Sequence, residues 1–503
     1  MRVTNNMMLN RTTSNINNNK YNVNNLNNQM SSQKKISRPS EDPVVAIRAL
    51  RLRSNLSEIN QYYEKNIPDA EAWLDVTETA LKNMQNILKD IRTQCVYGAN
   101  DSLKTEDRNT ILTQLQALRE QVYSEGNSDY AGRTVFTGYR TNEKLTFMEE
   151  EADTKYEISQ KFTYNDIQEY RYYDGQVEMK SADELIANAG KVSNPSCSTY
   201  DRIRLAYGNV ESLTQNDITF TDSNGNVSNP QNLTVYNSLE DWKKAGSSVA
   251  DNEVAFIKDS GELILGKDVS AALKTGKSSI SVDYAKQGFD KGEIRPEYYF
   301  NCTDVTDANN KIQYDKYDAN GKEITQDINY TIAMNQTLTV NTNASDVFNA
   351  DIGRDVDEMI NAVQAAIDAN DKVTKIEDMM NQVAYSDATS QEKLQGWLDA
   401  AKKEADYAND NLQKLYNSYI GNFDDYLSDV NLAITTVGSK GDRLELTENR
   451  MSNQQETVEN LKSNNEDREL SDIIIDYTAA YTAYQASLQA AGKVNQTSLL
   501  NYI

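Results

Sequence analysis

Apolar residues recur at helical spacing near both ends of the chain. The N-terminal set follows steps of seven, three and four residues, which places its members on one face of a helix. The C-terminal set alternates steps of three and four, as the seam of a coiled coil does. The first set is Ile16, Val23, Leu26 and Met30, and the second is Ile474, Tyr477, Tyr481, Tyr484 and Leu488. The pattern predicts a long helix at each end, with these residues as an assembly seam.

Further helical stripes follow inside the ends. Residues 73–91 and 111–122 carry apolar residues at helical spacing, and residues 356–367 begin another such stretch. Pro68 is expected in the first turn of a helix, where a missing backbone N–H is tolerated. After residue 367, helical spacing continues through most of the C-terminal part of the chain.

The middle of the chain has a different pattern. From about residue 134 to 344 it is rich in Tyr, Thr, Ile and Val. Residues 156–164, 328–332 and 338–340 alternate as strands do. Asn224-Gly225 is typical of a tight hairpin turn, because both positions need a positive φ. A β-rich insert is therefore predicted.

These patterns together predict an α+β protein. Its long N- and C-terminal helices are expected to form a coiled-coil or helical rod, with the β-rich insert projecting from the tip. The expected regions are 1–37 plus 470–503 for terminal assembly, 38–140 plus 345–469 for the helical rod, and 141–344 for the insert.

The two ends are expected to pack against each other. A lone amphipathic helix leaves its apolar face in water and gains most of its stability from packing. The N-terminal stripe is surrounded by asparagine, a mediocre helix former, so we expect it to be disordered until it finds a partner. Periodicity leaves two alternatives open: the core of a coiled-coil monomer or dimer, or a polymer in which copies associate through different surfaces.

Composition excludes several classes of function. The formal net charge is −25 and the mean hydropathy is −0.72, so phosphate backbones and anionic lipids would be repelled. Neither nucleic acid nor membrane insertion is expected, since no apolar run approaches the roughly 18 residues of a spanning helix. Histidine is absent and the three cysteines are scattered, which excludes His-based catalysis and predicts neither a metal site nor a cofactor. A carboxylate-based hydrolase on the insert stays possible by composition alone.

One N-terminal segment resembles a known family. Residues 30–46, MSSQKKISRPSEDPVVA, are similar to the segment that links the first two helices in the flagellin superfamily, with Gln33 where glycine is usual. Residues 127–138, NSDYAGRTVFTG, resemble a second family passage. The residues that carry the resemblance, and that are possible subunit contacts, are Arg38, Pro39, Ser40, Glu41, Asp42, Pro43, Gly132, Arg133, Phe136 and Gly138.

Within the superfamily, two passages resemble hook–filament junction proteins more than filament flagellins. They are residues 338–348, which precede a predicted helix, and residues 292–300. A filament-forming flagellin is the alternative. In either case the resemblance implies a structural protein of the bacterial flagellum and no enzyme.

The resemblance also implies how such a protein reaches its place. It would be secreted through the flagellar type III route without a cleaved signal peptide, and an export chaperone would bind its C-terminal helix. In the flagellum it would self-associate in a ring between hook-associated protein 1 and flagellin.

The Arg38–Pro43 motif has a simpler interpretation as an elbow between helices, because each proline restricts the residue before it to extended backbone. The surrounding basic cluster consists of Lys34, Lys35, Arg38, Arg48, Arg51 and Arg53. We expect it to be a solvated face or a complement to acidic neighbours.

Overall fold

The computed structural model describes residues 5–100, 103–318 and 321–496. The last seven residues of the predicted 470–503 region lie outside that range. The chain divides into two compact units. The terminal unit comprises Met1–Glu71, Tyr330–Leu338 and Asp442–Ile503, and the central unit comprises Ala72–Asn329 and Thr339–Gly441.

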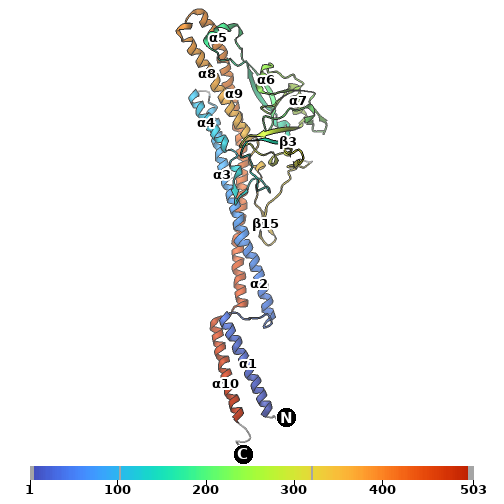
Figure 1. The fold of residues 1–503 in the computed structure, drawn as a ribbon, viewed down its shortest axis with the longest axis vertical. Coiled ribbons are helices and arrows are strands. Elements are labelled where there is room, and N and C mark those ends of the chain that lie inside the picture. The colour runs from blue at the N-terminus through green and yellow to red at the C-terminus, as the bar shows by residue number, and fades with distance from the viewer. Residues whose placement is uncertain (1–4, 101–102, 319–320, 497–503) are drawn as a thin grey trace, which may run out of the picture. The chain divides into compact units, whose positions relative to one another are not determined.

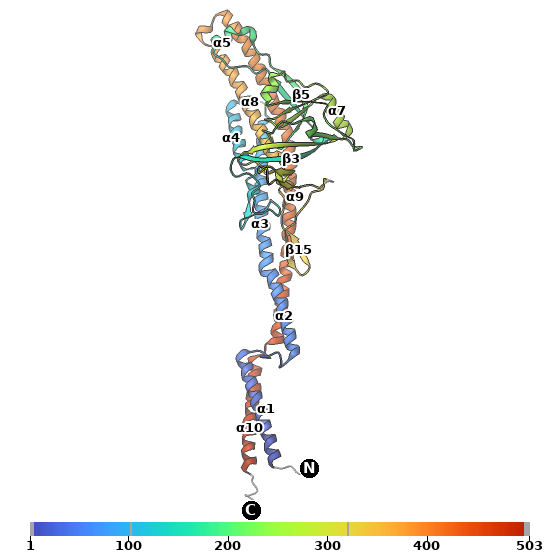
Figure 2. The same cartoon turned by 45° about the vertical axis from the view of Figure 1, so that its right-hand side comes forward.

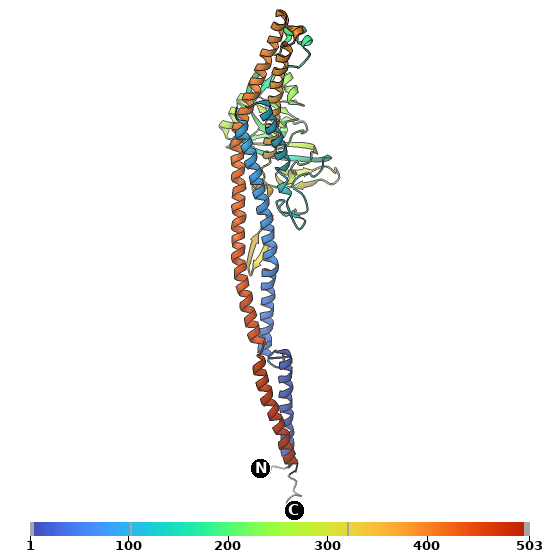
Figure 3. The same ribbon diagram turned by 90° about the vertical axis from the view of Figure 1, so that its left-hand side faces the viewer.

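In the terminal unit the two ends of the chain meet. Helix α1 (Asn5–Ser32) and helix α10 (Leu470–Gln496) lie side by side in every view (Figures 1, 2 and 3). The predicted pairing of the terminal helices is confirmed. Beyond them lie α2 (Pro43–Gln61), the start of α3 (Ile67–Gly98) and the end of α9 (Ala388–Glu466).

The predicted helix start at Pro68 coincides with a change in helix type. Residues Tyr62–Asn66 form a π-helix between α2 and α3, and the N–H of Ile67 donates to the carbonyl of Tyr62. Pro68 thus lies in the first turn of α3, where its missing N–H costs little. The π turn lies directly before the proline, in a helix that runs on from α2.

A small hairpin also belongs to the terminal unit. Strands β14 (Asn329–Ala333) and β15 (Gln336–Thr339) confirm the strands predicted at 328–332 and 338–340. The Asn66 side chain donates to the Thr331 carbonyl at 2.7 Å, and the Tyr330 hydroxyl donates to Asp69. These bonds attach the hairpin to the start of α3.

The helices of the central unit are α4 (Thr105–Gln121), α8 (Asp351–Met380) and parts of α3 and α9, with the short α5 (Ala182–Ala187), α6 (Leu239–Lys244) and α7 (Lys267–Gly276). The predicted stripes form its core. Trp73, Leu81, Met84, Ile91 and Leu115 are all fully buried.

The insert contains two sheets of mainly antiparallel strands. The six-stranded sheet has the order β13-β12-β3-β11-β6-β7, and the five-stranded sheet has the order β4-β5-β10-β9-β8, in which β8 and β9 are parallel. The strands are β3 (Glu151–Thr163), β4 (Gln168–Asp174), β5 (Ser196–Arg204), β6 (Ile218–Thr221), β7 (Val227–Ser228), β8 (Asn232–Tyr236), β9 (Glu253–Ile257), β10 (Glu262–Leu265), β11 (Ser279–Phe289), β12 (Asn301–Asp304) and β13 (Ile312–Tyr314). The predicted β-rich insert is confirmed. A turn does lie at Asn224-Gly225, but only Gly225 has a positive φ, +84°, and the loop that joins β6 to β7 spans residues 222–226, so the predicted tight two-residue turn is wrong.

The insert lies along the side of the α8–α9 pair as well as near its turn (Figures 1 and 2). Near the turn, Leu185 of α5 packs with Ile376 and Trp397, and the Trp397 indole N–H donates to the Leu185 carbonyl at 2.7 Å. The predicted projection from the tip therefore describes only part of the attachment, because the sheets also use the flank of α8.

Buried charges fasten the five-stranded sheet to that flank. Arg202 on β5 lies 2.6 Å from Glu262 and 2.8 Å from Glu358 of α8. The neighbouring Arg204 contacts Glu358 at 2.7 Å and also pairs with Asp355. Burial opposes ionisation of Glu358, but the two guanidinium groups outweigh it and hold its pKa well below the usual range. Removing one partner of such a buried set is strongly destabilising.

Among the described residues, no helix is long and apolar enough to cross a membrane.

Candidate assembly interface

The face of α1 that packs on α10 follows a regular heptad pattern. Six of its half-buried residues alternate steps of four and three, and they include all four members of the predicted N-terminal seam. The six are Thr12, Ile16, Asn19, Val23, Leu26 and Met30, and Asn25 and Gln29 are half-buried beside them. Polar residues such as Asn19 in a seam weaken packing but fix its register.

The matching face of α10 is shifted by one residue from the prediction for part of its length. Ile473 is fully buried, and Tyr477, Ala480, Tyr484, Ser487 and Ala491 are half-buried. The structure therefore places Tyr477 and Tyr484 of the predicted seam against α1. It leaves the other three predicted residues, Ile474, Tyr481 and Leu488, between 43% and 47% exposed.

These three exposed residues form a second stripe beside the first. They recur every seven residues, and so they lie on one line along the helix. Tyr481 stacks on Tyr477, with ring centroids 6.0 Å apart and an interplanar angle of 9°. Helix α10 thus has one apolar line against α1 and a second that α1 does not cover.

At the C-terminal end of α1 and the N-terminal end of α10 the two connecting segments pair like short strands. An antiparallel bridge joins Lys34 to Asp467. The Lys35 N–H donates to the Glu466 carbonyl at 2.7 Å, and the Arg468 N–H donates to the Gln33 carbonyl at 3.0 Å. We call residues 33–35 and 466–468 the joint. It ties together segments more than 400 residues apart in the chain.

Side-chain charges strengthen the joint. Arg53 grips the Glu466 carboxylate with two hydrogen bonds of 2.7 and 2.6 Å, and Lys34 pairs with Asp467. The hydrogen bond from Arg53 holds the pKa of Glu466 below its usual value, and that from Lys34 does the same for Asp467. Part of the predicted basic cluster is thus neutralised within the chain, whereas Arg38, Arg48 and Arg51 stay exposed.

The Arg38–Pro43 motif forms the elbow between α1 and α2. The Asp42 carboxylate caps α2 by accepting from the N–H groups of Val44 at 3.0 Å and Val45 at 3.1 Å, and Pro43 occupies the first turn. The Glu41 carboxylate accepts from Ser37 at 2.7 and 2.9 Å. Arg38, Pro39 and Ser40 lie exposed, where a neighbouring molecule can reach them.

The second motif builds a hairpin in the central unit. Strands β1 (Asp129–Tyr130) and β2 (Arg133–Thr134) are joined by Ala131-Gly132 with φ values of +51° and +77°. Two positive φ values in succession define the turn that suits a two-residue hairpin and explain the glycine. The Arg133 guanidinium lies 5.1 Å from the centre of the Trp73 ring.

The rest of this motif is internal. Phe136 is buried edge-on against Phe348, with ring centroids 4.9 Å apart. Gly138 has a φ of +63°, and a side chain there would meet Asn343. The structure brings these residues together inside the central unit, where they contribute to its packing.

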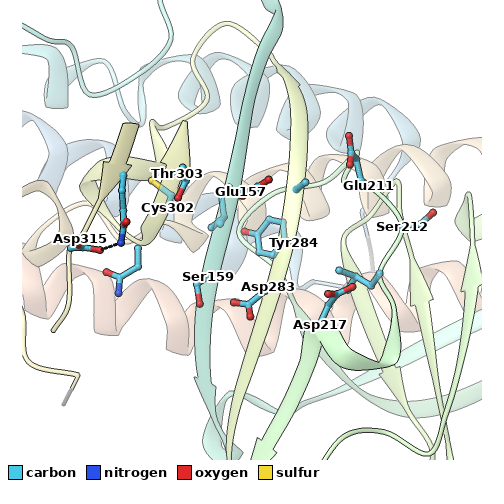
Figure 4. Close-up of a pocket in the computed structure, with 15 residues that line it drawn as sticks. Glu157, Ser159, Glu211, Ser212, Asp217, Asp283, Tyr284, Cys302, Thr303 and Asp315 are labelled. Carbon is cyan, nitrogen blue, oxygen red and sulfur yellow. Dashed lines mark hydrogen bonds between the residues drawn. The ribbon is translucent and has the colours of Figure 1, made fainter. Parts of the chain in front are cut away.

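A hollow with a volume of about 510 Å³ lies on the six-stranded sheet of the insert (Figure 4). Glu157, Glu211, Asp217, Asp283 and Asp315 line it. The carboxylates in Figure 4 point in separate directions, and no cluster suited to a metal ion occurs in the described part of the chain. Nothing in this geometry favours the hydrolase alternative.

Known families match both ends of the chain. The family model of the bacterial flagellin N-terminal helical region matches residues 3–141, and that of the flagellin C-terminal helical region matches residues 420–503. Each end of the chain is thus similar to a flagellin helical region. These flagellin regions contain α1, the elbow, the β1–β2 hairpin, the end of α9 and α10.

Curated relatives share part of this sequence. Flagellar hook-associated protein 3 of Salmonella typhimurium is 32% identical over 142 residues, which are 28% of this chain and 44% of that protein. The Escherichia coli K12 protein of the same name is 32% identical over 125 residues, 25% of this chain and 39% of that protein. The matches span less than half the length of either relative.

A solved structure of hook-associated protein 3 from Legionella pneumophila aligns with 82% of this chain and 96% of its own. The identity is 13% and the TM-score is 0.29.

Proposed function

We propose that this chain is a structural protein of the bacterial flagellum that joins the hook to the filament. The observation that carries the proposal is the pair of flagellin regions whose helices α1 and α10 meet along a heptad seam. The relatives named hook-associated protein 3 favour the junction over the filament. In this role the chain has no enzymatic activity, and its exposed surfaces serve as contacts.

The terminal pair provides a reason for assembly. Two thin helices bury little, and the line of Ile474, Tyr481 and Leu488 remains open to solvent. Because such helices gain stability from packing, neighbouring copies that cover this line stabilise the pair. Assembly then orders the ends, and the copies close into a ring when the rotation between them permits.

The proposal also names the neighbours of the chain in the flagellum and the route by which it is exported. Hook-associated protein 1 lies on one side of the ring and flagellin on the other. The chain leaves the cell by the flagellar type III route without a cleaved signal peptide, with a chaperone on α10 before export. The exposed apolar line of α10 supports this last point, since an uncovered apolar helix face is what an export chaperone would protect.

Truncation and localisation test the proposal. Residues 474–503 are removed from the full chain in a producing bacterium that lacks its own copy. We expect a soluble protein that no longer supports filament growth, because both apolar lines of α10 are lost. Antibody labelling of the unaltered protein should mark only the hook end of each filament.

A matched control is Gln485→Ala, which changes an exposed polar position on the same helix and should leave filaments normal. Normal filaments in cells that make only the truncated chain would contradict the proposal. Label along the whole filament would support the alternative of a filament-forming flagellin.

A further inference from the structure

A groove opens beside the joint in the terminal unit. It has a volume of about 190 Å³ and an apolar floor that includes Val45, Ala46 and Ala49 of α2. Leu50 forms its lip and is 65% exposed. Such a lined hollow next to an exposed leucine is suited to apolar side chains of a partner.

The rim of this groove is basic. Lys34, Arg38 and Arg53 line it. Lys34 and Arg53 are paired with Asp467 and Glu466 of the same chain, so the exposed Arg38 is the lining cation most open to a partner. The segment 34–53 contains six basic and two acidic residues in a chain whose net charge is −25. The groove therefore combines apolar contact with attraction for negative charge.

The first turns of α10 have the complementary character. Leu470, Ile474 and Ile475 are between 43% and 66% exposed. Three acids, Glu469, Asp472 and Asp476, flank them, and the sequence has no basic residue between 469 and 492. Asp476 is paired with Arg468 of the same chain, which leaves Glu469 and Asp472 as the acids offered to a neighbour. This acidic and apolar segment, residues 469–476, shares no residue with the groove lining.

We propose that the groove of one copy binds residues 469–476 of a neighbouring copy. The isoleucines would enter the groove over Ala46 and Ala49, and Asp472 would face Arg38. Since the two surfaces are different, the contact is heterologous, and every copy can both donate and accept. The inference rests on the proposed function, because it names the contact by which copies of the flagellar protein associate.

Cross-linking in assembled flagella tests this contact. Leu50→Cys and Ile475→Cys are combined on one full-length chain, with Cys197→Ser to remove the one native thiol that is not buried. Flagella are isolated from cells that make only this variant and are treated with a short bifunctional thiol reagent. We expect a ladder of dimers, trimers and larger species on a denaturing gel.

Two controls test whether the cross-linking is specific to the proposed contact. Leu50→Cys alone should give no ladder, because one surface cannot link a series of copies. Leu50→Cys with Val383→Cys places the second thiol at a site that is 89% exposed and outside the proposed contact, and should give no ladder either. Adding Arg38→Glu to the first variant should lower the yield of the ladder several-fold.

The outcomes separate the two proposals. Protein present at the hook end without a ladder, or with dimers only, overturns the head-to-tail contact and leaves the junction role intact. A ladder that Arg38→Glu does not weaken also contradicts the charge pairing. Protein absent from isolated flagella overturns the proposed function itself.

Discussion

Gln33 ends α1 with a left-handed backbone conformation. It follows α1 directly and has a φ of +54°. Its N–H donates to the Gln29 carbonyl at 2.7 Å, and its own carbonyl accepts from Arg468. A left-handed residue after a helix is usually glycine, because a Cβ is crowded there. By its resemblance, Gln33 stands where the flagellin superfamily usually carries glycine, the residue that adopts this conformation at least cost.

Gln33→Gly should therefore not harm the joint. We expect it to raise the free energy of unfolding by up to about 1 kcal/mol, since relief of the left-handed strain exceeds the added freedom of the unfolded chain. Urea unfolding followed by circular dichroism would measure the change. Ser31→Gly, inside α1, should instead lower stability, and an equal loss from both variants would contradict this account.

At the scale of elements, the joint is where α1 and α2 meet α9 and α10. Two backbone hydrogen bonds and the Arg53–Glu466 pair join segments from opposite ends of the chain. The Glu466 side chain is almost fully buried, whereas Arg53 is more than half exposed, so water screens the pair in part. The joint is a small element whose strength depends on two ionised carboxylates.

The joint should weaken in acid. The pKa values of Glu466 and Asp467 are lowered in the folded chain, so their contribution is present above the ordinary carboxyl pKa of about 4. It is lost as the pH falls through the lower folded values. Hydrogen exchange, corrected for its intrinsic pH dependence, should show the Lys35 and Arg468 amides losing protection below about pH 4.

Glu466→Gln supplies the comparison for that experiment. It should reduce protection at these amides at neutral pH by roughly fivefold, which corresponds to about 1 kcal/mol for a partly exposed pair. The remaining acid sensitivity should be smaller than that of the unaltered chain. If the variant lost protection in acid just as steeply, ionisation of Glu466 would not be the cause.

At the scale of the whole molecule, an acidic protein carries a few surfaces that favour association. The net charge of −25 makes copies repel one another at low ionic strength. The uncovered line of α10 and the basic groove beside the joint oppose that repulsion only where geometry brings them together. Because charge repulsion opposes these contact surfaces, the protein should assemble more readily on a template than by itself.

The purified chain should accordingly stay monomeric in solution. Sedimentation velocity at micromolar concentration should give a single species, because each copy lacks the ring partners that would hold its neighbours in place. If the purified chain polymerised by itself into long tubes, the filament-forming alternative would be favoured. Hook-associated protein 1 on isolated hooks should provide the missing template.

The sequence by itself determined the long helices toward both ends and the β-rich character of the middle, but not the individual strands of the two sheets or the short helices α5, α6 and α7. The stripe of Ile16, Val23, Leu26 and Met30 lies on the predicted face of α1, and residues 156–164 form most of β3. The motif at 38–43 also predicted an elbow, since proline geometry is local. These features were predictable because they depend on spacing within one element.

Only the tertiary structure decided which neighbour each face meets. Ile474, Tyr481 and Leu488 fit a heptad as well as Ile473, Ala480 and Ser487 do, and packing against α1 chose the second set. No spacing rule links Arg202 to Glu358 or Lys34 to Asp467, because their partners lie far away in the chain. Periodicity fixes a face within a helix, whereas its partner depends on how distant segments fold together.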